Sequence, residues 1–249
     1  MQTQKYSIQQ PLFESLRSRV PDSAYPKEVM EDRSGRIKGP GFFPGSTGLV
    51  SGTKALASRP VMVLGQDQDN QQGHDRSERE KVKGELSSKT WTNMSATFKD
   101  AGIDLGGCFF TNFIMGVRVN SKRNTGASPG LRHPDFMQAC SAFFIEQLKA
   151  QEPRVILCLG MVPFKLLSLV SSELCLQSIG IDSFKELDAR KMNVIMDVQF
   201  DALPKQRFVV VPLTHPSYKL NSRNRVISKL DTVHTEIELL QHVKKHSLK

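Results

Sequence analysis

The chain has 249 residues, of which 39% are hydrophobic, and its formal net charge at pH 7 is +9. This length and composition allow a sizeable hydrophobic core and exclude wholesale disorder. A basic excess of this kind is common in soluble proteins that bind nucleic acid or another anionic surface. The charge is uneven, because residues 205–249 carry a net charge of +6 and residues 111–132 one of +4.

We find neither a membrane span nor a secretion signal in the sequence. Its most apolar run, residues 155–170, is interrupted by Pro163 and Lys165 and is too short to cross a bilayer. The first ten residues, MQTQKYSIQQ, lack the apolar core of a signal peptide. The four cysteines form no CxxC pair, which favours reduced thiols. We therefore expect a cytoplasmic protein.

The first 58 residues differ in pattern from the rest of the chain. An amphipathic stretch over residues 8–20 leads into a loop rich in Gly and Pro, with GPGFFPGSTG at residues 39–48. We predict that residues 1–58 are an N-terminal extension that packs on a main domain formed by residues 59–249.

From residue 59 onwards, apolar and amphipathic segments alternate. Apolar runs typical of strands buried on both faces lie at residues 61–64, 108–111, 155–159 and 208–211. Helices are predicted over residues 91–101 and 134–151, from residue 163, and over residues 223–246. A polar loop and an irregular insertion are expected at residues 66–89 and 171–206. The alternation predicts an α/β fold, a three-layer α/β/α sandwich around a central four-stranded parallel sheet.

In sheets of this kind, ligands bind at the carboxyl ends of the strands. Three of the predicted strands are followed there by Asp67, Asn112 and His215. A carboxylate can orient water and stabilise a cation, and a neutral imidazole can donate a hydrogen bond to a developing oxyanion. The Asn side chain both donates and accepts, so it can read the edge of a base. The set suits a reaction that develops opposite charges on two parts of the substrate.

Short motifs at these three places resemble those of the uracil-DNA glycosylase superfamily. Its members carry GQDPY or GEAPG after the first strand, an Asn after the second and HPS after the fourth. This sequence has GQDQD at residues 65–69, TN at 111–112 and HPS at 215–217. Residues 134–160 and the segment HPSYKLNSRN also resemble bacterial family 4 members. The resemblance covers about residues 60–245.

The resemblance implies that a base is flipped out of the helix and that its N-glycosidic bond is hydrolysed. It implies that Asp67 positions water and stabilises the oxocarbenium-like sugar, and that His215 donates a hydrogen bond to O2 of the leaving pyrimidine. Asn112 is expected to read the pairing edge of the flipped base, and Gln66 to contribute mainly its backbone near O2.

The resemblance also implies DNA contacts close to the motifs. Pro216 and Ser217 are expected to pinch the phosphate backbone, and Tyr218 or Leu220 to fill the vacated stack. The basic residues that follow Asn112 and His215 are expected to form a rim for phosphates. This rim comprises Arg118, Lys122, Arg123, Arg132, Arg223 and Arg225.

The aromatic residue that stacks on the flipped base is left open, because no Phe lies between Gly65 and Phe98. Trp91 and His74 are the two candidates, and Trp91 suits a place in the core equally well.

The iron–sulfur cluster of family 4 is not expected here. That family uses four cysteines, two of them in an N-terminal CxxC. Cys140 matches one ligand by its context, but no cysteine precedes Cys108. We therefore expect no cluster, no metal and no other cofactor.

The base pocket departs from the family pattern as well. In GQDPY enzymes the final Tyr lies against C5 of uracil, whereas this chain has Asp69 there and Gln68 in place of the Pro. The acids and amides that follow, up to Asp75, suit hydroxyl groups. We hypothesise a substrate with a bulky, hydroxyl-rich group at C5, such as glucosylated hydroxymethylcytosine in phage DNA, and a role in defence.

The sequence thus predicts a monomeric DNA glycosylase. We expect it to be monofunctional, because the motif positions contain no Lys that could form the Schiff base of a lyase. A uracil-DNA glycosylase of base-excision repair, a non-catalytic DNA-binding module on the same fold and an enzyme acting on free nucleotides are the alternatives. The singled-out residues also have simpler interpretations: Asp67 as a helix cap or loop acid, Asn112 as a turn residue and His215 as a structural histidine.

Overall fold

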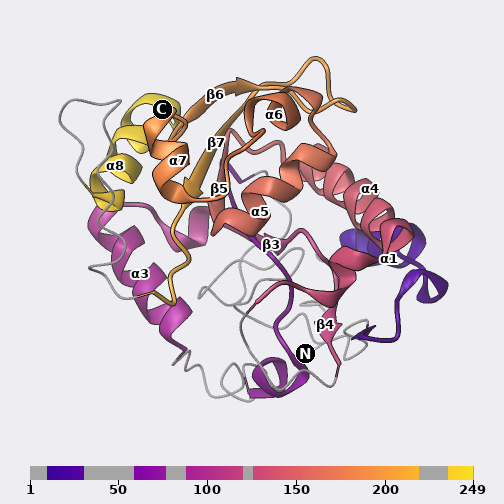
Figure 1. The fold of residues 1–249 in the computed structure, drawn as a ribbon. Helices are drawn as coiled ribbons and strands as arrows, with labels where there is room; N and C mark the ends of the chain where they lie inside the picture. Colours follow the sequence, from indigo (N-terminus) through magenta and orange to yellow (C-terminus); the bar gives the residue numbers. More distant parts are fainter. Residues whose placement is uncertain (1–9, 31–58, 77–87, 120–125, 219–234, 249) are drawn as a thin grey trace. The chain divides into compact units, whose positions relative to one another are not determined.

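The computed structural model describes residues 10–30, 59–76, 88–119, 126–218 and 235–248. The fold is α/β, with a central, mostly parallel sheet of five strands flanked by helices (Figure 1). The strand order is β3-β2-β5-β7-β6. The bounds are β2 Val61–Gly65, β3 Cys108–Asn112, β5 Val155–Leu159, β6 Ile195–Val198 and β7 Phe208–Leu213.

The predicted fold class is confirmed, and all four predicted strands are present. Every residue of β2, β3, β5 and β7 is buried, which explains why each shows as an uninterrupted apolar run in the sequence. The parallel pairing of β5 with β7 has Val155 opposite Val209 and Leu159 opposite Leu213.

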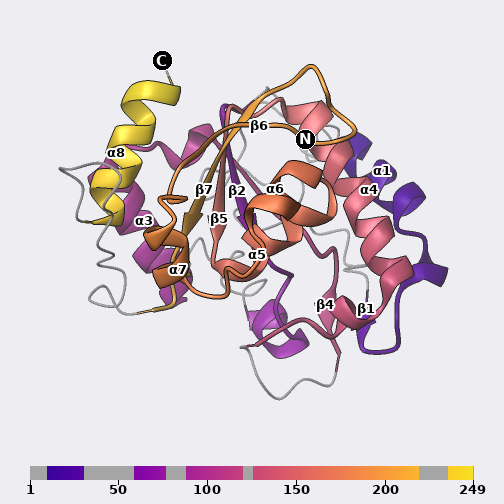
Figure 2. The same ribbon diagram turned by 45° about the horizontal axis from the view of Figure 1, so that its top comes forward.

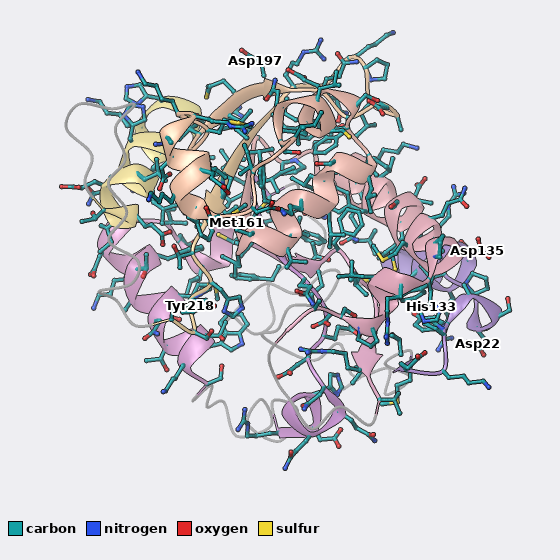
Figure 3. The ribbon with its side chains drawn as sticks, viewed as in Figure 1. Asp22, His133, Asp135, Met161, Asp197 and Tyr218 are labelled. Carbon is teal, nitrogen blue, oxygen red and sulfur yellow. The ribbon has the colours of Figure 1, made fainter. Side chains whose placement is uncertain are left out.

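The expectation of four strands is wrong by one, because β6 pairs antiparallel with β7 at the edge of the sheet. Only Ile195 and Val198 of β6 are buried, and its register shifts between these two residues. Asp197, which is labelled in Figure 3, has a left-handed backbone conformation within this irregularity, with φ 58°. A strand with such a bulge shows no regular alternation of polar and apolar residues, so its sequence resembles a loop.

The supposed irregular insertion over residues 171–206 also contains two short helices, α6 Ser172–Gln177 and α7 Phe184–Ala189. The hydroxyl of Ser171 accepts a hydrogen bond from the third backbone N–H of α6. Ser183 and Glu186 form a capping box at the start of α7. These helices are too short for a visible periodicity, and their caps are the signals that the sequence offered.

The longer predicted helices are present as α3 Lys89–Ala101, α4 Pro134–Gln151, α5 Met161–Leu166 and α8 Glu236–Ser247, and α4 has the predicted bounds. The start of α8 was predicted too early, because the helix begins at Glu236. Thr235 before it is extended and forms a capping box with Glu238. The polar loop was predicted too long, since residues 71–76 are helical and the side chain of Asn70 accepts the Gly73 N–H.

Two compact units make up the chain. The first comprises Met1–Arg59, Leu64–Leu86 and Phe109–Glu152. In it, α1 Gln10–Arg19 packs along α4, as both ribbon views show (Figures 1 and 2). The two-residue strand β1 Val29–Met30 pairs antiparallel with β4 Val117–Arg118. The separation of residues 1–58 as an extension stays a prediction.

The second unit comprises Pro60–Val63, Ser87–Cys108 and Pro153–Lys249. Helices α3 and α8 lie side by side in it (Figure 2). The Gln241 amide donates to the Asp100 carbonyl at 3.1 Å, and the Lys244 ammonium to the Gly102 carbonyl at 2.6 Å. Among the described residues, no helix has both the length and the apolar character that a bilayer crossing requires.

Candidate active site

The carboxylate of Asp67 lies two residues beyond β2 and is nearly enclosed by protein, with a side chain that is 5% exposed. Its Oδ2 lies 3.0 Å from Nε of Arg118, and its Oδ1 accepts a hydrogen bond from Nη2 of Arg118 at 3.4 Å. Oδ1 also accepts the backbone N–H of Asp69 at 3.2 Å. The Gln66 amide donates to Oδ2 at 3.4 Å and to the Gly126 carbonyl at 3.2 Å.

Two opposing effects act on the pKa of Asp67. Burial is the largest, and it raises the pKa above the ordinary value because a charged carboxylate is poorly solvated there. The Arg118 guanidinium, the Asp69 N–H and the Ser128 hydroxyl lower the pKa, whereas the charge of Asp69 raises it. The net shift is upward, and Arg118 is the strongest influence in the opposite direction.

Arg118 is therefore not a residue of the phosphate rim, and that expectation is wrong. Its side chain is only 6% exposed, and its Nη2 also lies 3.6 Å from Oδ1 of Asp69. The sequence signal that was missed is local, because Arg118 directly follows the buried residues Met115 and Val117. A buried Arg needs an acidic partner, and the nearest motif acid supplies it.

Asp69 starts the segment that replaces the aromatic wall of the GQDPY pattern. Its backbone is left-handed, with φ 72°, and its side chain is 39% exposed. Oδ1 of Asp69 accepts the Asn70 N–H at 2.7 Å. A Cβ atom on Gly73 would lie 2.2 Å from Oδ2 of Asp69, so the helical turn approaches this carboxylate closely. On the same turn, the His74 ring is partly buried and lies 3.8 Å from the Asp75 carboxylate.

In the second unit, His215 follows the end of β7 and lies in a tight turn. The Ser217 backbone N–H donates to Nδ1 of His215 at 3.2 Å, and the Ser217 hydroxyl lies 2.8 Å from the same atom. A backbone N–H only donates, so Nδ1 acts as an acceptor, and the proton of the neutral ring then resides on Nε2. The turn thus leaves a single N–H on the far side of the ring.

Helices α3 and α8 hold this turn from outside the HPS motif. The Asn93 amide donates to the carbonyl of Pro216 at 2.7 Å and to that of Tyr218 at 3.4 Å. The buried carboxylate of Glu236 accepts the Thr214 N–H at 2.6 Å. No sequence motif marked Asn93 or Glu236, because each lies in a helix far from HPS along the chain.

Tyr218 completes the turn with an N–H that donates to the His215 carbonyl at 3.0 Å. Its ring is on the surface near α3 and is 58% exposed (Figure 3). Pro216 is buried and Ser217 is exposed. The expected DNA contacts of these three residues stay predictions. Leu220, Lys122, Arg123, Arg223 and Arg225 lie outside the described residues.

Asn112 is buried at the end of β3 in the first unit. The residues that follow it, Phe113 and Ile114, donate their backbone N–H groups to the carbonyls of Gly65 and Gln66. These two hydrogen bonds bring the Asn112 and GQD segments together, as the sequence predicted for neighbouring strand ends. Trp91 is buried on α3 of the second unit, on the same helix face as Met94 and Phe98.

The cysteines do not form a ligand set for an iron–sulfur cluster. Cys108, Cys140 and Cys158 are buried and Cys175 is exposed. Burial raises the thiol pKa of Cys140 to about 12 and that of Cys158 further, which disfavours the thiolate that metals require. Within the described part of the chain, no three His, Cys, Asp or Glu side chains form a group that could hold a metal ion.

Comparison with known protein families agrees with the fold and the motif geometry. The family model of the uracil DNA glycosylase superfamily matches residues 55–239, which include all three motifs. The chain therefore belongs to this superfamily, whose members are in general glycosylase hydrolases that act on DNA. No curated protein sequence matches the chain.

Proposed function

We propose that this protein is a monofunctional DNA glycosylase that flips a pyrimidine nucleotide and hydrolyses its N-glycosidic bond, leaving an abasic site. The observation that carries the proposal is the Asp67 carboxylate, which directly follows the first motif strand and is fixed by Arg118 and by the Asp69 N–H. A solvated loop acid or a simple helix cap has no such enclosure.

In the proposed reaction, the bond between C1′ and the base nitrogen breaks and its electron pair leaves with the base. The Asp67 carboxylate stabilises the positive charge that develops on the sugar and orients a water molecule. The water oxygen then bonds to C1′ and gives one proton to the Asp67 carboxylate, which releases it through solvent to the departed base anion. The Nε2–H of His215 donates a hydrogen bond to O2, where negative charge gathers on the leaving base. Asn112 reads the pairing edge of that base.

The favoured substrate in this proposal is a cytosine with a bulky, hydroxyl-rich substituent at C5, as in glucosylated phage DNA. Support comes from Asp69, whose partly exposed carboxylate occupies the place of an aromatic wall. A carboxylate accepts hydrogen bonds from hydroxyl groups, whereas a Tyr ring at that place would exclude the substituent. The protein would then act in the cytoplasm as a monomer in defence against such phages.

The decisive experiment is a base-release assay on three matched duplexes that contain uracil, cytosine or glucosylated hydroxymethylcytosine. We expect release of the glucosylated base alone, and a loss of about 100-fold or more in Asp67→Asn with DNA binding retained. Efficient release of uracil with none of the glucosylated base would instead identify a repair enzyme. DNA binding by the wild type without release of any base would identify a non-catalytic module.

A further inference from the structure

We infer that Arg118 is a positioning residue for Asp67. The pairing of β1 with β4 makes residues 28–30 part of the backbone support of Arg118. The guanidinium orients the Asp67 carboxylate and favours its charged form. The activity part of this inference rests on the proposed function, whereas the electrostatic part does not.

The contact geometry restricts how the carboxylate can turn. Nε of Arg118 faces Oδ2 of Asp67 at 3.0 Å, while Nη2 faces Oδ1 at 3.4 Å, so two guanidinium nitrogens meet two carboxylate oxygens. The Nη2 contact is a hydrogen bond, whereas the Nε contact is an ion pair without hydrogen-bond geometry, so Arg118 restrains the carboxylate by one hydrogen bond and by its charge. A third interaction that restrains the carboxylate is the hydrogen bond that the Asp69 N–H donates to Oδ1 of Asp67.

Arg118 is itself held by backbone interactions on both sides. Its N–H donates to the Asp69 carbonyl at 2.9 Å, and it stands opposite Val29 in the antiparallel β1–β4 pair. The Val119 N–H donates to the Glu28 carbonyl at 2.8 Å. A Cβ atom on Gly116 would lie 2.4 Å from Cγ1 of Val29, so β1 packs directly against the residue before β4. Residues 28–30 thereby support the Arg118 backbone.

Two carboxylates share one guanidinium at this place. The groups that act on Asp67 are the charges of Arg118 and Asp69, the Ser128 hydroxyl and the Asp69 N–H, with the Gln66 amide in contact. Of these, Arg118 opposes the effect of burial most strongly. Without it, a buried carboxylate next to a second carboxylate has its pKa raised further and takes up a proton at higher pH.

A purely structural ion pair is the competing interpretation. Replacing both members of a buried ion pair with well-packed apolar residues is often neutral or stabilising, whereas removing one member leaves an uncompensated buried charge. Both interpretations expect the Asp67 titration to move when Arg118 is removed. They differ in kcat at pH values where Asp67 is charged, which a purely structural pair leaves unchanged in folded variants.

The test compares Arg118→Gln and Arg118→Lys with the matched control Arg19→Gln, which removes an exposed cation whose partner is Glu146 at 3.1 Å. Thermal unfolding identifies the folded variants. Carbon-13 NMR of the side-chain carboxyl groups, with the Asp67 signal assigned through Asp67→Asn, follows the titration of Asp67. The third readout is the pH dependence of kcat and KM for base release.

In Arg118→Gln we expect the titration of Asp67 and the acidic limb of kcat/KM to move upward by about one to three pH units, while KM changes little. Arg118→Lys keeps the charge but not the Nη2 hydrogen bond to Oδ1, so its acidic limb stays near that of the wild type while kcat falls about tenfold. Arg19→Gln leaves the Asp67 titration and the kcat of base release unchanged.

An unshifted Asp67 titration in folded Arg118→Gln overturns the inference. If that variant does not fold, an unchanged kcat in Arg118→Lys overturns it equally. If the wild type releases no base from any duplex, the proposed function fails, but the NMR titration of Arg118→Gln still decides the electrostatic role of Arg118.

Discussion

The Asp67 cluster and the His215 turn each hold one titratable side chain, but by different forces. Asp67 is enclosed, and its partners are the Arg118 guanidinium and the Asp69 N–H, while the Asp69 carboxylate shares the same guanidinium. His215 is half-buried, and its Nδ1 contacts the hydroxyl and the backbone N–H of Ser217, two residues further along the chain. A group that must carry charge in a protein interior needs a counter-charge, whereas a neutral ring needs only a fixed tautomer.

Both regions also depend on residues outside the motifs. Arg118 of β4 supports the GQD segment, and Asn93 of α3 supports the HPS turn. The orientation of the motif side chains therefore depends on residues of neighbouring elements that no motif includes.

The largest expected effect comes from removing the imidazole itself. We expect His215→Ala to lower kcat for base release by roughly 10² to 10³-fold, because the donor to the leaving base is lost. DNA binding should persist, and His246→Ala, which alters an exposed histidine near the end of α8, should have no effect. Equal activity of the two variants would remove His215 from the mechanism.

A smaller effect is expected from loosening the turn through Asn93. We expect Asn93→Ala to lower kcat about tenfold, because the carbonyls of Pro216 and Tyr218 lose their common donor. Nitrogen-15 NMR of His215 should then show a mixture of imidazole tautomers instead of the Nε2–H form. The exposed neighbour Thr92 supplies the control, Thr92→Ala. A pure Nε2–H tautomer in Asn93→Ala would show that the turn holds without α3.

The smallest effect is expected from Ser217→Ala. This change removes the hydroxyl next to Nδ1 but keeps the backbone N–H that fixes the tautomer. We therefore expect only a few-fold loss of kcat and an unchanged nitrogen-15 spectrum of His215. If the tautomer changes instead, the hydroxyl and not the backbone determines the proton position.

The sequence was sufficient for the parts of the fold that depend on local patterns. Fully apolar runs identified β2, β3, β5 and β7, and Pro134 marked the start of α4. Sequence analysis failed where tertiary contacts determine the structure. It missed the bulged edge strand β6. It also placed Arg118 on the surface because of its charge, whereas this side chain is buried against Asp67. Asn93 lies at a helix position that sequence alone cannot relate to HPS.

The left-handed backbone at Asp69 bears on any attempt to redesign the base preference. A Tyr at this position, as in GQDPY, would have to adopt φ 72°, which large L side chains rarely do. Its ring would also meet Gly73, which already lies close to the shorter Asp69 side chain. Conversion of residues 65–69 to the GQDPY pattern therefore needs a new path for the main chain as well as a new side chain.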